Sequence, residues 1–261
     1  MLLALSIITL AYAGLCLYAW LMANKLMFPK VVTTYAVGAQ NEGWITLKSA
    51  DGENITARYW QAPEATFTLL YNHGNGEDIG RISWLMQAYQ SRGISVLAYD
   101  YPGYGTSTGR PTESGILLAA EAAYRHMVDE LQIEPETIIP LGRSIGSGPA
   151  VHIAANHTVG GLVLESAFTS AFRVMTKRRI LPWDRFNNLS TIPQVQAPVL
   201  LMHGTHDSII PLWHAERLKS ALTVPHAYFW VAGGGHNNLI EVAGENYWRV
   251  LQAFLDGLKD A

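Results

Sequence analysis

The sequence predicts an α/β protein whose mostly parallel sheet of eight strands is flanked by helices and preceded by one membrane-spanning helix. Two observations support this prediction. Over most of the chain, short apolar runs alternate with stretches of helical periodicity, which is the pattern of βαβ units. Residues 1–24 contain no charged side chain, whereas the rest of the chain holds all 18 Lys and Arg and all 21 Asp and Glu. The two parts are therefore expected to occupy different environments.

Length and composition exclude several classes of protein. A chain of 261 residues with 49% hydrophobic and 15% charged residues fits one globular domain with a membrane segment better than a disordered chain. The net charge of -3 and the lack of any run of five basic residues argue against nucleic acid as a partner. The single cysteine, Cys16, excludes an internal disulfide and a cysteine-based zinc cluster.

Residues 1–24 are predicted to form a transmembrane anchor. A helix rises about 1.5 Å per residue, so this length crosses a hydrocarbon core of roughly 30 Å. Tyr18 and Trp20 lie near its end, where aromatic rings favour the headgroup level, and Lys25 and Lys30 follow. The alternative is a cleaved signal peptide, which usually has a basic start and a shorter apolar core. No basic side chain precedes Lys25, so an uncleaved anchor is favoured.

The side of the membrane is predicted from charge. Lys25 and Lys30 lie behind the helix, and the positive-inside rule then favours a cytoplasmic globular domain. Glycosylation sequons begin at Asn54, Asn156 and Asn188 and would favour the lumenal side if they were used. Both sides stay open at this point.

Residues 25–43 are interpreted as a linker and residues 44–261 as the globular domain. Two segments, 44–48 and 55–60, alternate apolar and polar residues around the turn pair Asp51-Gly52, and are expected to form antiparallel edge strands. Six further apolar runs suit strands buried on both faces: 67–71, 94–99, 137–141, 162–164, 199–202 and 227–231. Amphipathic stretches predict helices near 78–91, 113–131, 145–156, 212–222 and 245–258.

Ligands of such sheets bind beyond the carboxyl ends of the strands, so catalytic residues are expected in the loops there. Gly142-Arg143-Ser144-Ile145-Gly146 stands between a predicted strand and a predicted helix. A serine on a sharp, strained turn needs neighbours without Cβ two positions away on either side. Its hydroxyl then projects above the sheet, and the N–H of Ile145 points toward a reacting carbonyl. Ser144 is therefore the predicted nucleophile.

A serine nucleophile needs a base, and the base needs an orienting acid. Chain order in this arrangement is serine, acid, histidine. Asp207 follows the predicted strand 199–202, and His236 follows 227–231 after three glycines that allow the backbone to bend sharply. Asp207 and His236 are therefore the predicted acid and base.

Other residues near the strand ends compete for these roles. Glu165 is the only other carboxylate placed to serve as the acid, although a structural role beside the nucleophile is favoured. His203, His206 and His214 could suggest zinc, but they straddle a loop without a carboxylate partner other than the predicted acid, so no metal is expected. Asp100 follows a strand within a Pro- and Gly-rich stretch that predicts a tight loop held by its polar side chains.

The loop after 67–71 is expected to complete an oxyanion hole. Its sequence, Asn72-His73-Gly74-Asn75-Gly76, places a backbone N–H, best assigned to Asn75, opposite that of Ile145. His73 could be a second base, but a residue that holds the loop is the favoured interpretation.

Over residues 44–259 the chain resembles the α/β-hydrolase superfamily. Within it, the chain is most similar to membrane-anchored α/β-hydrolase-domain serine hydrolases, a group that includes protein depalmitoylases and bacterial relatives. The resemblance implies hydrolysis of an ester or thioester through an acyl-enzyme on Ser144, with His236 as base and then acid and Asp207 orienting it. The segments that carry it are His73-Gly74-Asn75-Gly76, Asp100-Tyr101-Pro102-Gly103-Tyr104-Gly105, Gly142 to Gly148, Glu165-Ser166-Ala167-Phe168, His203-Gly204-Thr205-His206-Asp207 and Gly235-His236-Asn237.

The substrate stays open. Depalmitoylases of this group are attached through an N-terminal cysteine cluster, whereas this chain has only Cys16. A peptidase or amidase with the same triad, and a non-catalytic binding protein on a hydrolase fold, are the alternatives. Dinucleotide and phosphate-loop motifs are absent from the sequence, so no cofactor is expected.

Residues 168–197 are predicted to form a short cap segment over a comparatively open pocket. The basic stretch 177–179 is interpreted as the solvated face of a cap helix, with a membrane-facing lip that admits an acyl chain as the alternative.

Overall fold

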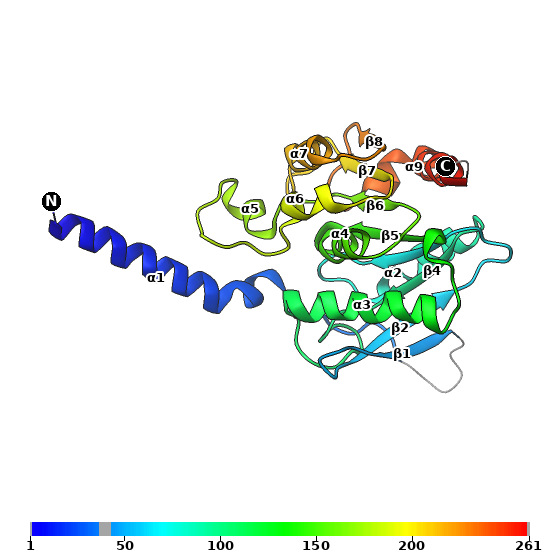
Figure 1. The fold of residues 1–261 in the computed structure, drawn as a ribbon, viewed down its shortest axis with the longest axis horizontal. Coiled ribbons are helices and arrows are strands. Elements are labelled where there is room, and N and C mark those ends of the chain that lie inside the picture. Colours follow the sequence, from blue (N-terminus) through cyan, green and yellow to red (C-terminus); the bar gives the residue numbers. More distant parts are fainter. Residues whose placement is uncertain (1, 37–42, 260–261) are drawn as a thin grey trace.

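The computed structural model describes residues 2–36 and 43–259, and its centre is one eight-stranded sheet (Figure 1). The strand order is β1-β2-β4-β3-β5-β6-β7-β8. The β1–β2 and β2–β4 pairs are antiparallel and all other pairs are parallel. The strands are β1 (Trp44–Lys48), β2 (Asn54–Trp60), β3 (Thr68–Asn72), β4 (Ser95–Tyr99), β5 (Ile138–Arg143), β6 (Leu162–Glu165), β7 (Val199–Gly204) and β8 (His226–Val231).

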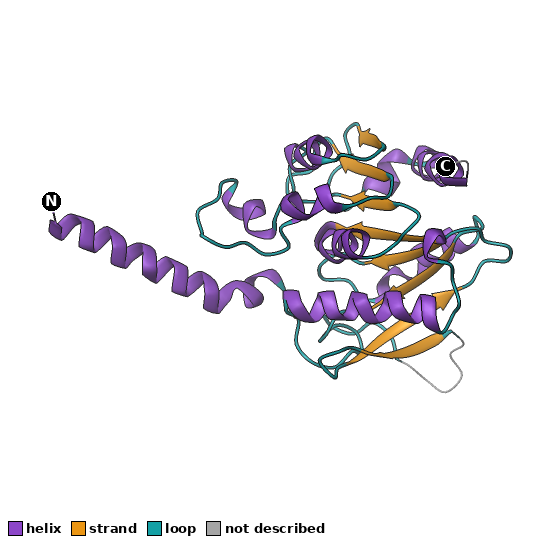
Figure 2. Cartoon of the chain, in the orientation of Figure 1, coloured by secondary structure: helices purple, strands orange, loops and turns teal. Residues whose placement is uncertain are grey.

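Helices cover both faces of this sheet (Figure 2). Because neighbouring residues of a strand point to opposite faces, Leu70 and Leu97 join a core with α3, α4 and α7, whereas Leu69 and Val96 join a core with α2 and α9. The sheet is thus buried from both sides, as parallel sheets usually are. These helices are α2 (Ile79–Gln90), α3 (Glu113–Asp129), α4 (Ser147–Asn156), α7 (Trp213–Ala221) and α9 (Glu245–Lys259).

The prediction of a mostly parallel eight-stranded α/β sheet is confirmed, with one correction. The segment that became β2 is not an edge strand: it pairs with β1 on one side and with β4 on the other. The expected hairpin is present, and Gly52 in its loop has a φ of 88°. Two short helices were not predicted, because each is under two turns long: α6 (Asn188–Thr191) and α8 (Leu239–Ala243). A short cap helix was expected, and α5 (Ala171–Thr176) lies in that segment but ends before residues 177–179.

The N-terminal helix α1 (Leu2–Met27) projects away from the sheet (Figure 1). Its length and apolar composition are sufficient to cross a membrane. Ala23 is buried, whereas large apolar side chains such as Leu3 and Leu10 are 75% and 72% exposed. Such a surface is unfavourable in water and fits an apolar surrounding.

The cap lies between β6 and β7 and contains α5 and α6. Its chain path is fixed by Asp184, which accepts hydrogen bonds from the Ser170 hydroxyl at 2.6 Å and the Phe172 N–H at 3.1 Å. Lys177 ends α5 with a left-handed φ of 57°. The basic stretch 177–179 therefore begins where α5 ends. The interpretation of this stretch as the solvated face of a cap helix is wrong.

Candidate active site

Ser144 occupies a sharp turn between β5 and α4. Its φ is 54°, in the left-handed region that costs energy for residues other than glycine. A Cβ added at Gly142 would lie 2.4 Å from the Gly146 carbonyl oxygen, and one added at Gly146 would lie 2.1 Å from the Asn72 carbonyl oxygen. The two glycines of the pentapeptide are therefore required by close backbone approach, as the sequence predicted.

Three predicted residues meet at the carboxyl ends of the strands. Ser144 Oγ lies 3.0 Å from His236 Nε2, and His236 Nδ1 lies 2.7 Å from Asp207 Oδ2. They come from the ends of three strands, β5, β7 and β8, which the parallel sheet brings to one edge. These contacts have the geometry that a serine nucleophile, a general base and an orienting carboxylate require.

The backbone holds Asp207 in place. Its Oδ1 accepts hydrogen bonds from the N–H groups of Ile209 at 2.9 Å and Ile210 at 2.7 Å, which leaves Oδ2 facing His236. Burial alone would raise the pKa of Asp207, but the hydrogen bonds from His236 and Ile210 outweigh it and hold the pKa below its usual value. The carboxylate is thus ionised at neutral pH and can stabilise a proton on His236.

The competing residues have other hydrogen-bond partners, although His203 Nε2 also lies 3.5 Å from Asp207 Oδ2. Glu165 is buried and accepts a hydrogen bond from the Tyr247 hydroxyl, whereas His236 is paired with Asp207. His203 Nε2 donates to the Ile210 carbonyl at 2.7 Å, and His214 Nδ1 lies 3.1 Å from the Thr169 backbone nitrogen. These two histidines are engaged in internal hydrogen bonds.

The loop after β3 borders the same cavity as Ser144. Asn75 and Ile145, predicted to supply the oxyanion hole, both line that cavity. The Asn75 side chain accepts a hydrogen bond from the Tyr104 hydroxyl at 2.6 Å and donates to the Met27 carbonyl at the end of α1. The loop is thereby held between the domain and α1.

An ion pair that sequence reasoning missed connects this loop with the nucleophile turn. The Arg143 guanidinium binds the Glu77 carboxylate, and the other Glu77 oxygen accepts the Gly74 N–H at 2.8 Å. Arg143 also donates to the Asn237 side chain at 3.2 Å, next to His236. Glu77 and Arg143 lie 66 positions apart in the sequence. Only their positions next to the two motifs, in the loop after β3 and in the turn at Ser144, could have suggested that they meet.

Glu77→Gln is expected to lower kcat by about 10- to 100-fold, since loss of a charged hydrogen bond is typically worth 1.5–3 kcal/mol. The amide would put a donor toward Arg143 or toward the Gly74 N–H, and the loop after β3 would shift. Steady-state kinetics on a chromogenic ester measures this. Glu241→Gln, on the exposed side of α8, is the matched control. Equal rates for Glu77→Gln and wild type would exclude a positioning role.

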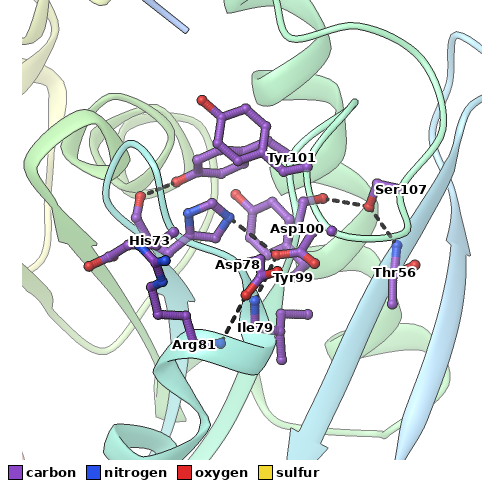
Figure 3. A network of polar contacts seen from close by, with 12 residues as sticks. Thr56, His73, Asp78, Ile79, Arg81, Tyr99, Asp100, Tyr101 and Ser107 are labelled. Atoms are coloured by element: carbon purple, nitrogen blue, oxygen red, sulfur yellow. Dashed lines mark hydrogen bonds and ion pairs between the residues drawn. The ribbon is translucent and has the colours of Figure 1, made fainter. Parts of the chain in front are cut away.

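His73 and Asp100 form a buried network beneath the loop (Figure 3). Asp100 Oδ1 accepts the Ile79 N–H at 2.9 Å and lies 3.5 Å from His73 Nε2, while the Tyr35 hydroxyl binds the other carboxylate oxygen. The His73 ring stacks on Tyr101, whose hydroxyl donates to the His73 carbonyl at 2.7 Å. Both side chains are fully buried, which fits the prediction that they hold the loop.

The contribution of Asp100 to stability is expected to fall as pH rises toward neutrality, because burial raises the pKa of Asp100 to about 7. A carboxyl group whose pKa is raised on folding stabilises the protein below its unfolded pKa, and this contribution is lost as pH rises through the folded pKa. The slope is at most about 1.4 kcal/mol per pH unit. Urea unfolding of Asp100→Asn between pH 4 and 7 should show a flatter dependence than wild type. Parallel curves would contradict the assignment.

A cavity of about 610 Å³ opens onto Ser144 and His236. This volume lies within the range of small-molecule sites, roughly 300–1,000 Å³. The lining is mostly apolar and includes residues of α1, the cap and the loop after β7. Among the described residues of this lining, Glu77 and Arg143 are the acidic and basic side chains other than histidine, and they neutralise each other.

The fold and this constellation define a hydrolase of the α/β class. The chain matches the family described as Serine aminopeptidase, S33, over residues 63–186. It is 34% identical over 209 residues to alpha/beta hydrolase domain-containing protein 17B of Homo sapiens, covering 78% of this chain and 72% of that protein. The corresponding Xenopus tropicalis protein is 35% identical over the same shares.

Solved structures agree on the fold. A Pyrococcus furiosus esterase superposes with a TM-score of 0.74 at 17% identity, covering 88% of this chain and 98% of that chain. The chain therefore belongs to the α/β-hydrolase superfamily and, within it, is of the alpha/beta hydrolase domain-containing protein 17 type.

Proposed function

We propose that this protein is a membrane-anchored serine hydrolase that cleaves carboxylic esters or thioesters of acyl groups through an acyl-enzyme on Ser144. The observation that carries the proposal is the chain of contacts from Ser144 to His236 at 3.0 Å and from His236 to Asp207 at 2.7 Å, open to a largely apolar cavity. A serine hydroxyl alone is a poor nucleophile, and this arrangement supplies the base that it needs.

Each residue has one chemical role in this mechanism. His236 Nε2 removes the proton of the Ser144 hydroxyl as Oγ attacks the acyl carbon, and Asp207 stabilises the imidazolium that forms. The N–H groups of Asn75 and Ile145 stabilise the negative oxygen of the tetrahedral intermediate. His236 then gives the proton to the leaving alkoxide or thiolate. Water repeats the sequence on the acyl-enzyme, releasing the carboxylic acid and free Ser144.

An aminopeptidase is the second candidate, because the family that matches residues 63–186 carries that description. An aminopeptidase must bind the substrate's ammonium group, usually by a carboxylate. Glu77 is the carboxylate among the described residues of the cavity lining, and it is already paired with Arg143. The apolar lining and the engaged carboxylate favour an acyl group over a free amino terminus.

We further propose that residues 1–24 anchor the protein in the membrane and that residues 25–43 link this anchor to the catalytic domain. Residues 44–261 form the catalytic domain, with the cap segment at 168–197. The length and apolar surface of α1 support the anchor. Lys25 and Lys30 at its end favour a cytoplasmic catalytic domain.

The test compares three substrates that share the octanoyl group with one aminopeptidase substrate. Purified full-length protein receives an octanoyl p-nitrophenyl ester, an octanoyl thioester of a small thiol, octanoyl p-nitroanilide and leucine p-nitroanilide. Turnover of the ester and thioester with little turnover of either anilide is expected. Preference for leucine p-nitroanilide would favour the aminopeptidase. A folded protein that turns over none of the four would support a non-catalytic binding protein.

A further inference from the structure

A buried histidine lies directly behind the carboxylate of the triad. His203 is next to the last residue of β7, and its side chain is fully buried. It is not among the described residues that line the cavity over Ser144. A residue in this place acts on the reaction through a neighbour and not by touching the substrate.

The chain turns sharply after His203 and returns over the end of β7. A Cβ added at Gly204 would lie 2.2 Å from the Gly234 carbonyl oxygen, so glycine lets the loop that carries Asp207 approach the loop that carries His236. The Asp207 N–H donates to the Gly204 carbonyl at 3.3 Å and closes the turn. The position of the carboxylate therefore depends on the contacts that hold this short loop.

Ile210 is the residue at which the loop is held. Its N–H donates to Asp207 Oδ1 at 2.7 Å, and its carbonyl accepts a hydrogen bond from His203 Nε2 at 2.7 Å. His203 Nε2 also lies 3.5 Å from Asp207 Oδ2, the oxygen that faces His236. One ring nitrogen thus contacts both the carboxylate and the residue that holds the carboxylate.

The His203 ring is a fixed hydrogen-bond donor at neutral pH. A carbonyl oxygen only accepts, so the bond to Ile210 requires a proton on Nε2. Burial lowers the pKa of His203, so the ring does not take up a second proton at neutral pH. Among the described residues, Nδ1 has no hydrogen-bond partner, and the polar contacts of the ring are therefore made through Nε2.

Titratable groups from three elements act on this ring. The carboxylates of Asp207 and of Glu216 on α7 raise its pKa and His236 lowers it, but burial is the largest effect. His214 on α7 is neutral as well, because burial and the neighbouring His203 lower its pKa to about 4. The ring therefore stays uncharged in the pH range in which His236 can act as a base.

We propose that His203 is a positioning residue for the hydrolysis: its Nε2–H holds the loop at Ile210 and thereby keeps Asp207 Oδ2 facing His236. This inference rests on the proposed function and adds to it a residue outside the cavity. Asp207 stabilises the imidazolium only while its carboxylate is aligned with His236 Nδ1. Position outweighs charge here, because the bond to Ile210 is 2.7 Å long whereas the carboxylate oxygen is 3.5 Å away.

Two replacements of similar length test this role. His203→Gln keeps an N–H donor near the position of Nε2, whereas His203→Met has no donor and leaves the Ile210 carbonyl unpaired. Hydrolysis of p-nitrophenyl butyrate by the full-length protein gives kcat and KM, and each rate is divided by the concentration of sites that a fluorophosphonate labels. His203→Met is expected to lower kcat by about tenfold or more with little change in KM, since misplaced catalytic groups slow the chemical step. His203→Gln should recover most of this loss.

The pH profile supplies a measurement that a packing defect does not move. The acidic limb of kcat/KM reports the pKa of His236 in the free enzyme. An imidazolium that loses its aligned carboxylate is less stable, so this limb should move down by about half a pH unit or more in His203→Met. His203→Asn, whose shorter amide ends before the Nε2 position, should behave like His203→Met. In His203→Gln the limb should stay near that of wild type.

His206→Gln is the matched control, because His206 is an exposed histidine of the same loop. Its kcat should stay within about twofold of wild type, since exposed substitutions usually change little. An acidic limb at the wild-type position in both His203→Met and His203→Asn, or a loss of kcat that His203→Gln does not recover, would overturn the inference while the proposed function stands. An upward shift of the limb would show that His203 acts on Asp207 by charge and would overturn it too. Absence of both labelling and turnover in wild type would overturn the proposed function itself.

Discussion

Ser144→Ala is expected to lower kcat for ester hydrolysis by about 10⁴-fold or more, because residues of a triad act as a unit. The Ser144 hydroxyl is bonded to His236 at 3.0 Å, and alanine can take the same backbone turn, so the fold should persist. Turnover of p-nitrophenyl esters gives the rate, and labelling with a fluorophosphonate should disappear together with it.

Ser220→Ala is the control for this experiment. Ser220 lies on the exposed side of α7 and its hydroxyl donates to the Glu216 carbonyl. This variant should be labelled and turn over esters like wild type. Continued turnover by a folded Ser144→Ala protein would show that another group attacks the substrate.

Asp207→Asn is expected to lower kcat by about 10³- to 10⁴-fold. The N–H groups of Ile209 and Ile210 hold Oδ1, so the asparagine oxygen must take that position and its NH₂ must face His236. A donor there binds the imidazole tautomer whose proton is on Nε2, and this nitrogen can then no longer accept the Ser144 proton. The measurement is kcat at neutral pH, with circular dichroism to confirm folding.

The comparison with Glu165→Gln decides which carboxylate is the acid. Glu165 is bonded to Tyr247, so its replacement should affect stability more than kcat. High activity in Asp207→Asn combined with a large loss in Glu165→Gln would assign the acid to Glu165.

The sheet and the three residues at its edge could be predicted because the responsible signals are local. Buried strands leave short apolar runs, and the predicted segment 199–202 differs from β7 only at its end. The turn at Ser144 also has a local signal in its two glycines. A Cβ at Gly142 would lie 2.4 Å from the Gly146 carbonyl oxygen, and a Cβ at Gly146 would lie 2.1 Å from the Asn72 carbonyl oxygen on the neighbouring strand. Chain order then selected Asp207 and His236.

Contacts between distant segments could not be predicted in the same way. The Glu77–Arg143 pair and the bond from Tyr35 to Asp100 join segments that only the folded sheet brings together. The role of α1 was hidden for another reason. Apolar residues lie on every face of α1, so the sequence predicts a membrane helix without distinguishing one face from another. Only the packed structure shows that one face lines the cavity.

The central claim is that Ser144 becomes acylated, and trapping that intermediate tests it most directly. Full-length protein in phosphatidylcholine vesicles is mixed with p-nitrophenyl hexadecanoate, quenched in acid within the first turnovers, digested and examined by mass spectrometry. The account predicts a hexadecanoyl group on the peptide that contains Ser144, absent from Ser144→Ala treated in the same way. An acyl group on another residue, or turnover of the ester with an unmodified Ser144 peptide at every quench time, would contradict it.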